Sequence, residues 1–297
     1  IAAGCLAFVR WAAFGPAFAG AELRHKRWSL SAPPKSRARN VLVCALPPAK
    51  KEQLTILDNA DAVGSAVQAC VEEAAEKAIA ERGHFALAIP GGSILKMLAG
   101  TAPAWASKTT LAYVNHKCVA MDDGQLATHA KAMKGFLGAW SGINTILLEG
   151  SADGGAEAAA YEAKLRALPA GALPLDADGL PVFDLMLVGV GDDGHVGSLY
   201  PARDEVLVTG KWVLPVAMKD PPSITLSLPV MKAAKKVVIA ACGVSEKYPQ
   251  GKSDAMKRAV EGAEDLQSFP AAGLREKASY IFDAAAASKL SDDYGAK

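Results

Sequence analysis

The sequence is poor in cysteine and has no two cysteines at close spacing. Its 297 residues contain an odd number of widely separated cysteines, namely Cys5, Cys44, Cys70, Cys118 and Cys242. Neither a zinc site of the CxxC type nor a disulfide framework is indicated by such a distribution. We therefore expect the folded part of the chain to lie in a reducing compartment.

An excess of charge of either sign is also absent. The chain has 32 lysines and arginines against 31 aspartates and glutamates, which gives a formal net charge of +1. Proteins that hold nucleic acid or an anionic membrane surface through a basic field need a larger imbalance. The composition therefore disfavours nucleic acid and an anionic membrane surface as partners.

A long uninterrupted apolar run is missing as well. The apolar stretch 1–21 is broken by Arg10, Gly15 and Pro16, so it does not predict a membrane span. Residues 22–45 are basic and contain one acidic residue, Glu22. An apolar segment followed by such a tract is typical of plastid presequences. We predict a targeting presequence over residues 1–45 and a location in the plastid stroma, with a disordered extension and a cytoplasmic location as alternatives.

Residues 46–297 predict a single α/β domain. Apolar residues recur at helical spacing over 62–80, with Glu72, Glu73 and Lys77 on the opposite face, so this segment is expected to form an amphipathic helix. Strands and helices then alternate without hairpin signals, which favours a Rossmann-like, mainly parallel sheet covered by helices on both faces. Strands are expected at 85–89, 110–114, 143–148, 183–188, 212–216, 224–228, 237–241 and 279–282, and helices at 126–140, 155–168 and 253–260, with short helices from Ser93 and Pro229.

The most informative segment is 183–201. Its apolar run predicts a strand buried on both faces, and this strand leads directly into a glycine-rich turn that contains Asp192, Asp193 and His195. Ligands bind at the carboxyl ends of strands in open α/β sheets. His195 is the best candidate for a general base, because a neighbouring Asp could orient its imidazole. The alternative is a structural histidine that caps the turn.

The three other histidines of this part of the chain have weaker contexts. His84, His116 and His129 lack a neighbouring pattern that points to chemistry. We expect them to be surface residues or hydrogen-bonded structural residues.

A second turn has the composition of an anion cradle. Gly91, Gly92 and Ser93 follow the strand expected at 85–89 and precede a helix, so backbone N–H groups and the positive end of the helix could face a phosphate. The spacing is neither that of a P-loop nor that of the GxGxxG fingerprint. An ordinary connection between strand and helix is the alternative.

These motifs resemble those of one family. The segment GVGDDGHVGSLYP closely resembles the signature G-x-G-x-D-G-H-x-A-S-L-F-P of the 6-phosphogluconolactonases, relatives of the glucosamine-6-phosphate isomerases/deaminases. AIPGGSILKML resembles the family's phosphate loop, VNHKCVAMDD resembles V-D-E-R-C-V-P-x-D-D, and SITLSLP resembles R-I-T-L-T-L-P, the last followed by a Gly-x-x-x-Lys turn. The match covers about residues 60 to 290.

The resemblance implies hydrolysis of a sugar phosphate lactone, 6-phosphoglucono-1,5-lactone, without a metal or an organic cofactor. His195 matches the histidine that activates water, with Asp192 or Asp193 as its acidic neighbour. Gly91, Gly92 and Ser93 match the loop that holds the sugar phosphate, and Lys247 matches a lysine near that phosphate.

The chain also departs from the family pattern. Asn115-His116-Lys117 stands where the family has Asp-Glu-Arg, which places Asn115 and Lys117 at the reacting centre in place of a carboxylate and a guanidinium. Ile94-Leu95 replaces Thr-Pro, Ala127-Thr128 replaces Ser-Asn, and no arginine precedes Ile224. Lys96, Lys117 and Lys219 could supply positive charge instead.

These departures keep two alternatives open. The chain could be a weakened or inactive homologue that binds a sugar phosphate or serves as a subunit of a larger assembly. It could also be an aldose–ketose isomerase/deaminase, although that branch resembles G-H-I-A-F-N-E-P and this chain has Ser198-Leu199-Tyr200-Pro201 after its histidine turn.

Overall fold

A computed structural model describes residues 45–244 and 251–294 of the chain. Lys247 and all but the last residue of the predicted presequence lie outside these residues. The described residues belong to one compact unit, and none of their helices is long and apolar enough to cross a membrane.

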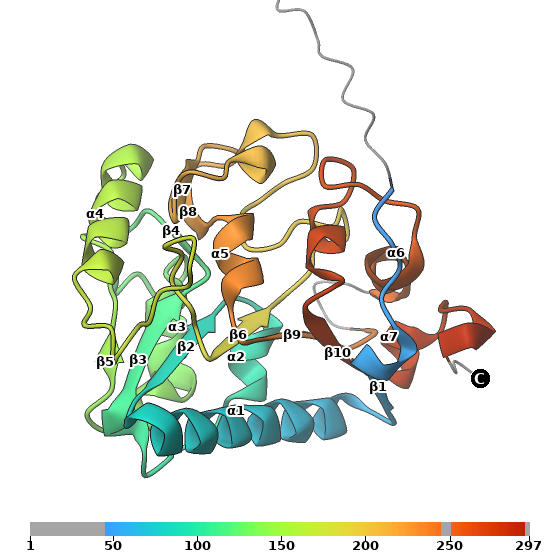
Figure 1. Ribbon diagram of the computed structural model, residues 1–297, viewed down its shortest axis with the longest axis horizontal. Helices are drawn as coiled ribbons and strands as arrows, with labels where there is room; N and C mark the ends of the chain where they lie inside the picture. Colours follow the sequence, from blue (N-terminus) through green and yellow to red (C-terminus); the bar gives the residue numbers. More distant parts are fainter. Residues whose placement is uncertain (1–44, 245–250, 295–297) are drawn as a thin grey trace, which may run out of the picture. The chain divides into compact units, whose positions relative to one another are not determined.

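A seven-stranded sheet forms the centre of this unit (Figure 1). Its strands run parallel throughout, in the order β1-β10-β9-β6-β2-β3-β5. The prediction of a mainly parallel α/β sheet is therefore confirmed. The strands are β1 (Leu54–Leu57), β2 (Phe85–Ile89), β3 (Thr109–Tyr113), β5 (Asn144–Thr145), β6 (Leu185–Val188), β9 (Lys236–Ala241) and β10 (Ala278–Asp283).

Helices cover both faces of the sheet, as predicted. Alternate residues of a strand point to opposite faces, so Phe85, Leu87 and Ile89 of β2 pack into one core cluster and Ala86 and Ala88 into another. The first cluster includes residues of α1 (Ala60–Arg82), α2 (Ser93–Met97) and α3 (Thr128–Gly135). The second includes residues of α4 (Gly154–Arg166), α5 (Leu228–Ala233), α6 (Ser253–Glu261) and α7 (Ala284–Ala287).

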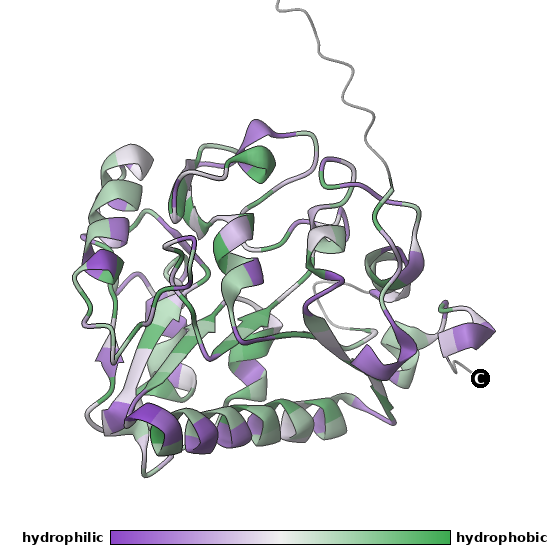
Figure 2. Ribbon diagram, in the orientation of Figure 1, coloured by the Kyte–Doolittle hydropathy of each residue, from purple (hydrophilic) through white to green (hydrophobic). Residues whose placement is uncertain are grey.

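The long helix α1 shows how the sequence pattern determines packing. Val63, Val67 and Val71 recur along one side and are buried, whereas its charged residues form the outer side, as the alternating colours along this helix show (Figure 2). Asn59 caps the helix at its start, and Gly83, with φ of 78°, ends it.

The connections leave the sheet in opposite directions at β2 and β6. The chain passes from β2 to β3 and then to β5 on one side, whereas β6 is followed by β9 and β10 on the other side. Neighbouring strands whose connections diverge leave a crevice at their carboxyl ends. The two predicted turns, 91–93 and 189–197, follow these two central strands.

A small antiparallel sheet was not predicted. It has the order β4-β8-β7, with β4 (Asn115–Lys117), β7 (Val213–Val216) and β8 (Ser223–Leu226). Asn115–Lys117 was not among the strands expected from the sequence. Three polar residues carry no strand signal of their own, and pairing with β8 supplies their extended conformation. The absence of hairpin signals was also misleading, because β7 and β8 are antiparallel neighbours joined by a proline-containing loop.

Two element boundaries also differ from expectation, and one strand was missed. The helix predicted at 126–140 ends at Gly135, because the backbone of Phe136 leaves the helical region, and a short 3-10 turn over Leu137–Ala139 follows. The strand predicted at 143–148 pairs only over Asn144–Thr145. The edge strand β1 was missed because four residues carry too short a pattern to be recognised.

Candidate functional site

The turn after β6 folds tightly around His195. The N–H of Gly191 donates to the carbonyl of His195 at 2.9 Å, and the N–H of Gly194 donates to the carbonyl of Gly191 at 2.9 Å. A Cβ on Gly191 would lie 2.1 Å from the imidazole of His195, and one on Gly194 would lie 2.3 Å from the ring of Phe269. Side chains at these positions would displace the histidine or open the turn, so glycine is required at both.

His195 and Asp193 form a hydrogen-bonded pair within this turn. The Nδ1 atom of His195 lies 2.6 Å from Oδ1 of Asp193, which also accepts the backbone N–H of His195 at 3.1 Å. Because a carboxylate only accepts, Nδ1 carries the proton, and the lone pair of the neutral ring is on Nε2. Burial opposes ionisation of Asp193, but the hydrogen bonds from His195 outweigh it and lower the pKa of the carboxyl.

The neighbouring Asp192 is placed differently. Its side chain is exposed and makes no hydrogen bond or ion pair with the described residues, and it does not line the cavity beside His195. Of the two acidic candidates, the geometry therefore joins Asp193 and not Asp192 to the histidine.

Tyr200 supports the other side of the imidazole. The ring centroids of His195 and Tyr200 are 4.7 Å apart, and Nζ of Lys219 lies 5.1 Å above the ring of Tyr200. Lys219 belongs to the loop between β7 and β8 and does not line the cavity. Its charge thus acts on the aromatic support of His195 rather than from the cavity wall.

A large cavity opens beside the histidine. Its volume is about 980 Å³, and it lies at the carboxyl ends of β2 and β6, as their diverging connections predict. It brings together seven of the residues singled out from the sequence, namely Gly91, Gly92, Ser93, Lys96, Asn115, Lys117 and His195.

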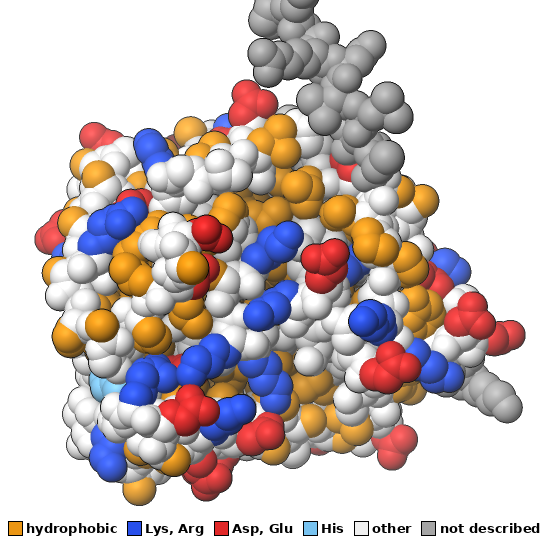
Figure 3. Space-filling view, viewed as in Figure 1, with side chains coloured by type: hydrophobic (Ala, Val, Ile, Leu, Met, Phe, Trp, Pro, Cys, Tyr) orange, Lys and Arg blue, Asp and Glu red, His pale blue; other side chains and the backbone are white. Residues whose placement is uncertain are grey.

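The charge of this cavity is positive. Lys96, Lys117, Lys131 and Lys252 line it, against one acidic residue, Asp61. Within the described residues, the first three make no ion pair. Figure 3 shows basic side chains gathered in the lower middle of the face that it draws. Lysines without acidic partners favour an anionic ligand.

The glycine loop forms one wall of the cavity. Gly92 has φ of 83° and precedes α2, while Ser93 is exposed at the start of that helix. A Cβ on Gly91 would lie 3.1 Å from Oγ1 of Thr128, so the loop packs against the first residue of α3. The wall is thus built by two helix starts.

Asn115 and Lys117 come from β4, on another wall. Residues two apart on a strand share a face, and both line the cavity while His116 between them is fully buried. Nδ2 of Asn115 donates to Oγ of Ser198 at 3.2 Å. Ser198 belongs to the histidine turn, so this bond links the two candidate catalytic segments.

Sequence reasoning missed two lysines of the cavity. Lys131 lies in α3, and Lys252 immediately precedes α6, where its Nζ donates to the carbonyl of Val190 at 2.8 Å. The Gly-x-x-x-Lys spacing pointed to Lys247, which lies outside the described residues. The strand-to-helix connection holds two lysines, Lys247 and Lys252, so the spacing that pointed to the first gave no signal for the second.

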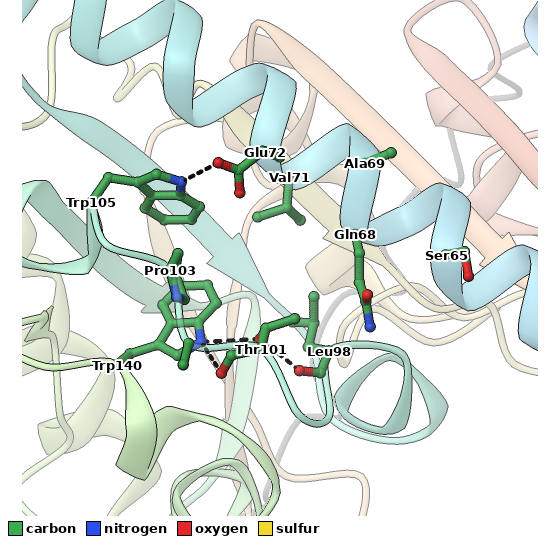
Figure 4. A pocket seen from close by; sticks show the side chains of 11 residues that line it. Ser65, Gln68, Ala69, Val71, Glu72, Leu98, Thr101, Pro103, Trp105 and Trp140 are labelled. Atoms are coloured by element: carbon green, nitrogen blue, oxygen red, sulfur yellow. Dashed lines mark hydrogen bonds between the residues drawn. The ribbon is translucent and has the colours of Figure 1, made fainter.

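A second cavity, of about 440 Å³, lies between α1 and the segment after α2 (Figure 4). The indole N–H of Trp105 donates to Glu72 at 2.8 Å, and that of Trp140 donates to the carbonyl of Thr101 at 3.1 Å. Its indole donors are therefore already used, and it contains neither histidine nor lysine.

The residues 45–244 and 251–294 contain no group of three or more His, Cys, Asp and Glu side chains that could hold a metal ion. His84 is hydrogen-bonded to Oγ1 of Thr110 at 2.9 Å. The described side chains thus offer the candidate chemistry of an acid–base pair and an anion site.

Fold and site together define a class of protein. It is a parallel α/β protein with a lysine-lined cavity at the switch point of its sheet and a histidine–carboxylate pair at the cavity edge.

The chain belongs to the family described as glucosamine-6-phosphate isomerases/6-phosphogluconolactonase, whose model matches residues 58–282. The human 6-phosphogluconolactonase is 31% identical to it over 256 residues, which cover 80% of this chain and 93% of the human one. The rat 6-phosphogluconolactonase is 33% identical, over 76% of this chain and 89% of the rat protein.

Solved structures share the fold. A 6-phosphogluconolactonase from Trypanosoma cruzi has a TM-score of 0.67 at 16% identity and covers 83% of this chain and 99% of its own. A monomeric glucosamine-6-phosphate deaminase has a TM-score of 0.57 at 16% identity, and the match covers 79% of this chain and 98% of the deaminase chain. Because both branches of the family share the fold, the reaction has to be argued from the site and from the closer relatives.

Proposed function

We propose that this protein hydrolyses 6-phosphoglucono-1,5-lactone to 6-phosphogluconate, a step of the pentose phosphate pathway. The observation that carries the proposal is the His195–Asp193 pair, which presents Nε2 at the edge of a lysine-lined cavity. The human and rat relatives named 6-phosphogluconolactonase, matched over most of their length, support this choice of reaction.

His195 acts as the general base. Its Nε2 takes a proton from a water molecule while the water oxygen attacks the lactone carbonyl carbon. Asp193 keeps the proton on Nδ1 and stabilises the imidazolium that forms. When the bond between the carbonyl carbon and the ring oxygen breaks, His195 returns the proton to the ring oxygen, which becomes a hydroxyl group.

The negative charges of the substrate match the rest of the cavity. The phosphate is held by the N–H groups of Gly92 and Ser93 and by Lys96 and Lys131, and Lys252 adds positive charge beside the histidine turn. Lys117 supplies positive charge for the carbonyl oxygen as it becomes an oxyanion. Lysine can fill this role as a point charge, without the bidentate geometry of the family's arginine.

The experiment compares wild type with His195→Ala in a lactone hydrolysis assay that records the spontaneous rate in parallel. Wild-type hydrolysis well above that rate, lost in the variant, supports the proposal.

A second candidate function is supported by Asn115 alone. The Asn115 amide, which is hydrogen-bonded to Ser198, brings no charge to the reacting centre. This would suit a protein that binds a sugar phosphate without turnover, either alone or as a subunit of a larger assembly. Tight binding of 6-phosphogluconate without hydrolysis of the lactone would favour it.

We also propose that residues 1–45 direct the protein to the plastid stroma, as their apolar start and basic continuation suggest. A fluorescent protein fused behind residues 1–45 tests this proposal. Accumulation in plastids supports it, and diffuse cytoplasmic fluorescence contradicts it.

A further inference from the structure

His116 stands between two residues of the candidate site but faces away from it. It is the central residue of β4 and is fully buried, whereas Asn115 and Lys117 on either side line the cavity. A buried imidazole must satisfy both ring nitrogens.

The two hydrogen bonds of His116 fix its tautomer. Nδ1 lies 2.7 Å from the carbonyl oxygen of Lys117, which can only accept, so Nδ1 carries the proton. Nε2 then holds a lone pair, and it accepts the backbone N–H of His129 at 3.0 Å. Both bonds exist together only in the neutral ring.

The donor on the second bond belongs to the start of a helix. His129 is the second residue of α3, and the first N–H groups of a helix have no partner within it. Ala127, at the N-cap position, makes no side-chain bond to them. His116 therefore caps α3 from another element, β4, in the place where a helix usually has a polar side chain of its own.

The capped helix carries part of the anion site. Its first residue, Thr128, packs against Gly91 of the glycine loop, and Lys131, one turn further, lines the cavity. The side chain of His129 is tied to the hydroxyl of Tyr113 at 2.8 Å, and the rings of Tyr113 and His116 are 5.2 Å apart. The start of α3 is thus held at two points.

From these contacts we propose that neutral His116 is a positioning residue, which locks β4 to the first turn of α3 and so holds Lys131 at the phosphate and Lys117 at the reacting end of the same ligand. The inference rests on the proposed function for the identity of the ligand, a sugar phosphate.

Protonation of His116 would break this lock. A proton on Nε2 would face the N–H of His129 and the positive end of α3. The charged and titratable groups around it are His129 and Lys131 of α3, Lys117 of β4, Tyr113 of β3 and Glu157 of α4. Burial is the main reason why the pKa of His116 is lowered, and His129 and Lys131 act in the same direction while Glu157 opposes them.

The test measures binding of 6-phosphogluconate, and separately of inorganic phosphate, by calorimetry between pH 5.5 and 7.5. His116→Leu removes the acceptor, and at pH 7.5 it should raise the Kd about 5- to 10-fold, as expected for loss of a helix cap at a binding site. His116→Gln can still donate to Lys117 and accept from His129 but cannot titrate. Its Kd at pH 7.5 should stay within about twofold of wild type, and its affinity should fall less steeply than that of wild type towards pH 5.5.

His84→Gln is the matched control, because His84 is a hydrogen-bonded histidine outside the cavity. It should bind like wild type at every pH, and thermal unfolding of each variant checks that it is folded. If His116→Leu does not fold, the pH dependence of His116→Gln decides.

The proposal is overturned if wild type and His116→Gln lose affinity equally towards acid, or if His84→Gln reduces the pH dependence of binding as much as His116→Gln does. It is also overturned if folded His116→Leu binds as tightly as wild type, or if wild type binds neither ligand. Wild-type binding without lactone hydrolysis would contradict the proposed function alone.

Discussion

The Nδ1 atom of His195 lies 2.6 Å from Oδ1 of Asp193 within one glycine-rich turn. This bond holds the ring in the tautomer whose lone pair is on Nε2, which is the form that a general base requires. Asp193→Asn removes the carboxylate and allows the other tautomer, and we expect kcat for the lactone to fall on the order of 100-fold.

The adjacent carboxylate provides the control for this change. Asp192→Asn alters charge equally, but Asp192 is exposed and makes no hydrogen bond or ion pair with His195, so kcat should stay within about twofold. An equal fall in kcat in the two variants would show that kcat depends on the net charge of the turn and not on the hydrogen bond to His195.

Asn115 allows a direct test of the departure from the family pattern that the sequence suggests. Its Nδ2 donates to Ser198 at 3.2 Å, and an aspartate could instead accept from the same hydroxyl group. Asn115→Asp should therefore fold normally and place a carboxylate beside the reacting centre, and we expect kcat/KM to rise about 3- to 10-fold. Stopped-flow hydrolysis of fresh lactone measures it, and a fall in kcat/KM would mean that the amide is adapted to this site.

Arg275 is a buried cation that holds backbone rather than a carboxylate. It is 1% exposed, and its guanidinium donates to the carbonyls of Ala259 at 2.8 Å, Leu46 at 2.9 Å and Gly262 at 2.8 Å. Arg275→Met would leave these acceptors unpaired, and we expect the free energy of unfolding to fall by about 3 to 5 kcal/mol.

Lys257→Met is the control, because Lys257 lies on α6, the helix whose Ala259 carbonyl accepts from Arg275, but is exposed and pairs with Glu261 at 3.5 Å. Lys257→Met should lower the free energy of unfolding, measured by urea denaturation, by no more than about 0.5 kcal/mol. If Arg275→Met lowers the free energy of unfolding by less than about 1 kcal/mol, water must replace the guanidinium as the hydrogen-bond partner of these carbonyls.

The histidines packed into the fold make folding sensitive to acid. Burial is the first cause that lowers the pKa of His84, His116 and His129 below their ordinary value of 6.5. Below about pH 6.5 the unfolded chain therefore binds protons that the folded chain does not. The contribution of these neutral histidines to the free energy of unfolding should be fully present above this pH. It should fall as the pH decreases, by at most about 1.4 kcal/mol per pH unit for each histidine.

Urea denaturation at pH 7.5, 6.5 and 5.5 measures this dependence, in a range above the pKa values of the carboxyl groups. His116→Gln should show a shallower slope than wild type. A free energy of unfolding that does not change over this range would contradict the effect of burial.

Much of the fold could be predicted because the central strands are apolar on both faces. Phe85–Ile89 and Leu185–Val188 are fully buried, and such runs, in a chain that also contains a helix as regular as Ala60–Arg82, leave few alternatives to a parallel sheet. The small antiparallel sheet could not be predicted, since Asn115–Lys117 becomes a strand only through pairing with Ser223–Leu226.

The candidate site was predictable only in part. His195 and the glycine loop have local patterns, because backbone turns require glycine at fixed places. Lys131 and Lys252 carry no such pattern, because a lysine within a helix or just before one is usually solvated. Only the tertiary structure brings them to the cavity. The capping of α3 by His116 joins elements that sequence spacing does not relate.

The central claim is that His195 activates water for lactone hydrolysis. The most direct measurement is the rate of hydrolysis of 6-phosphoglucono-1,5-lactone by wild type and by His195→Ala, each corrected for the spontaneous reaction. We predict that the variant loses on the order of 100- to 10,000-fold in kcat while it still binds 6-phosphogluconate. Wild-type activity no higher than the spontaneous rate, or full activity in His195→Ala, would contradict the claim.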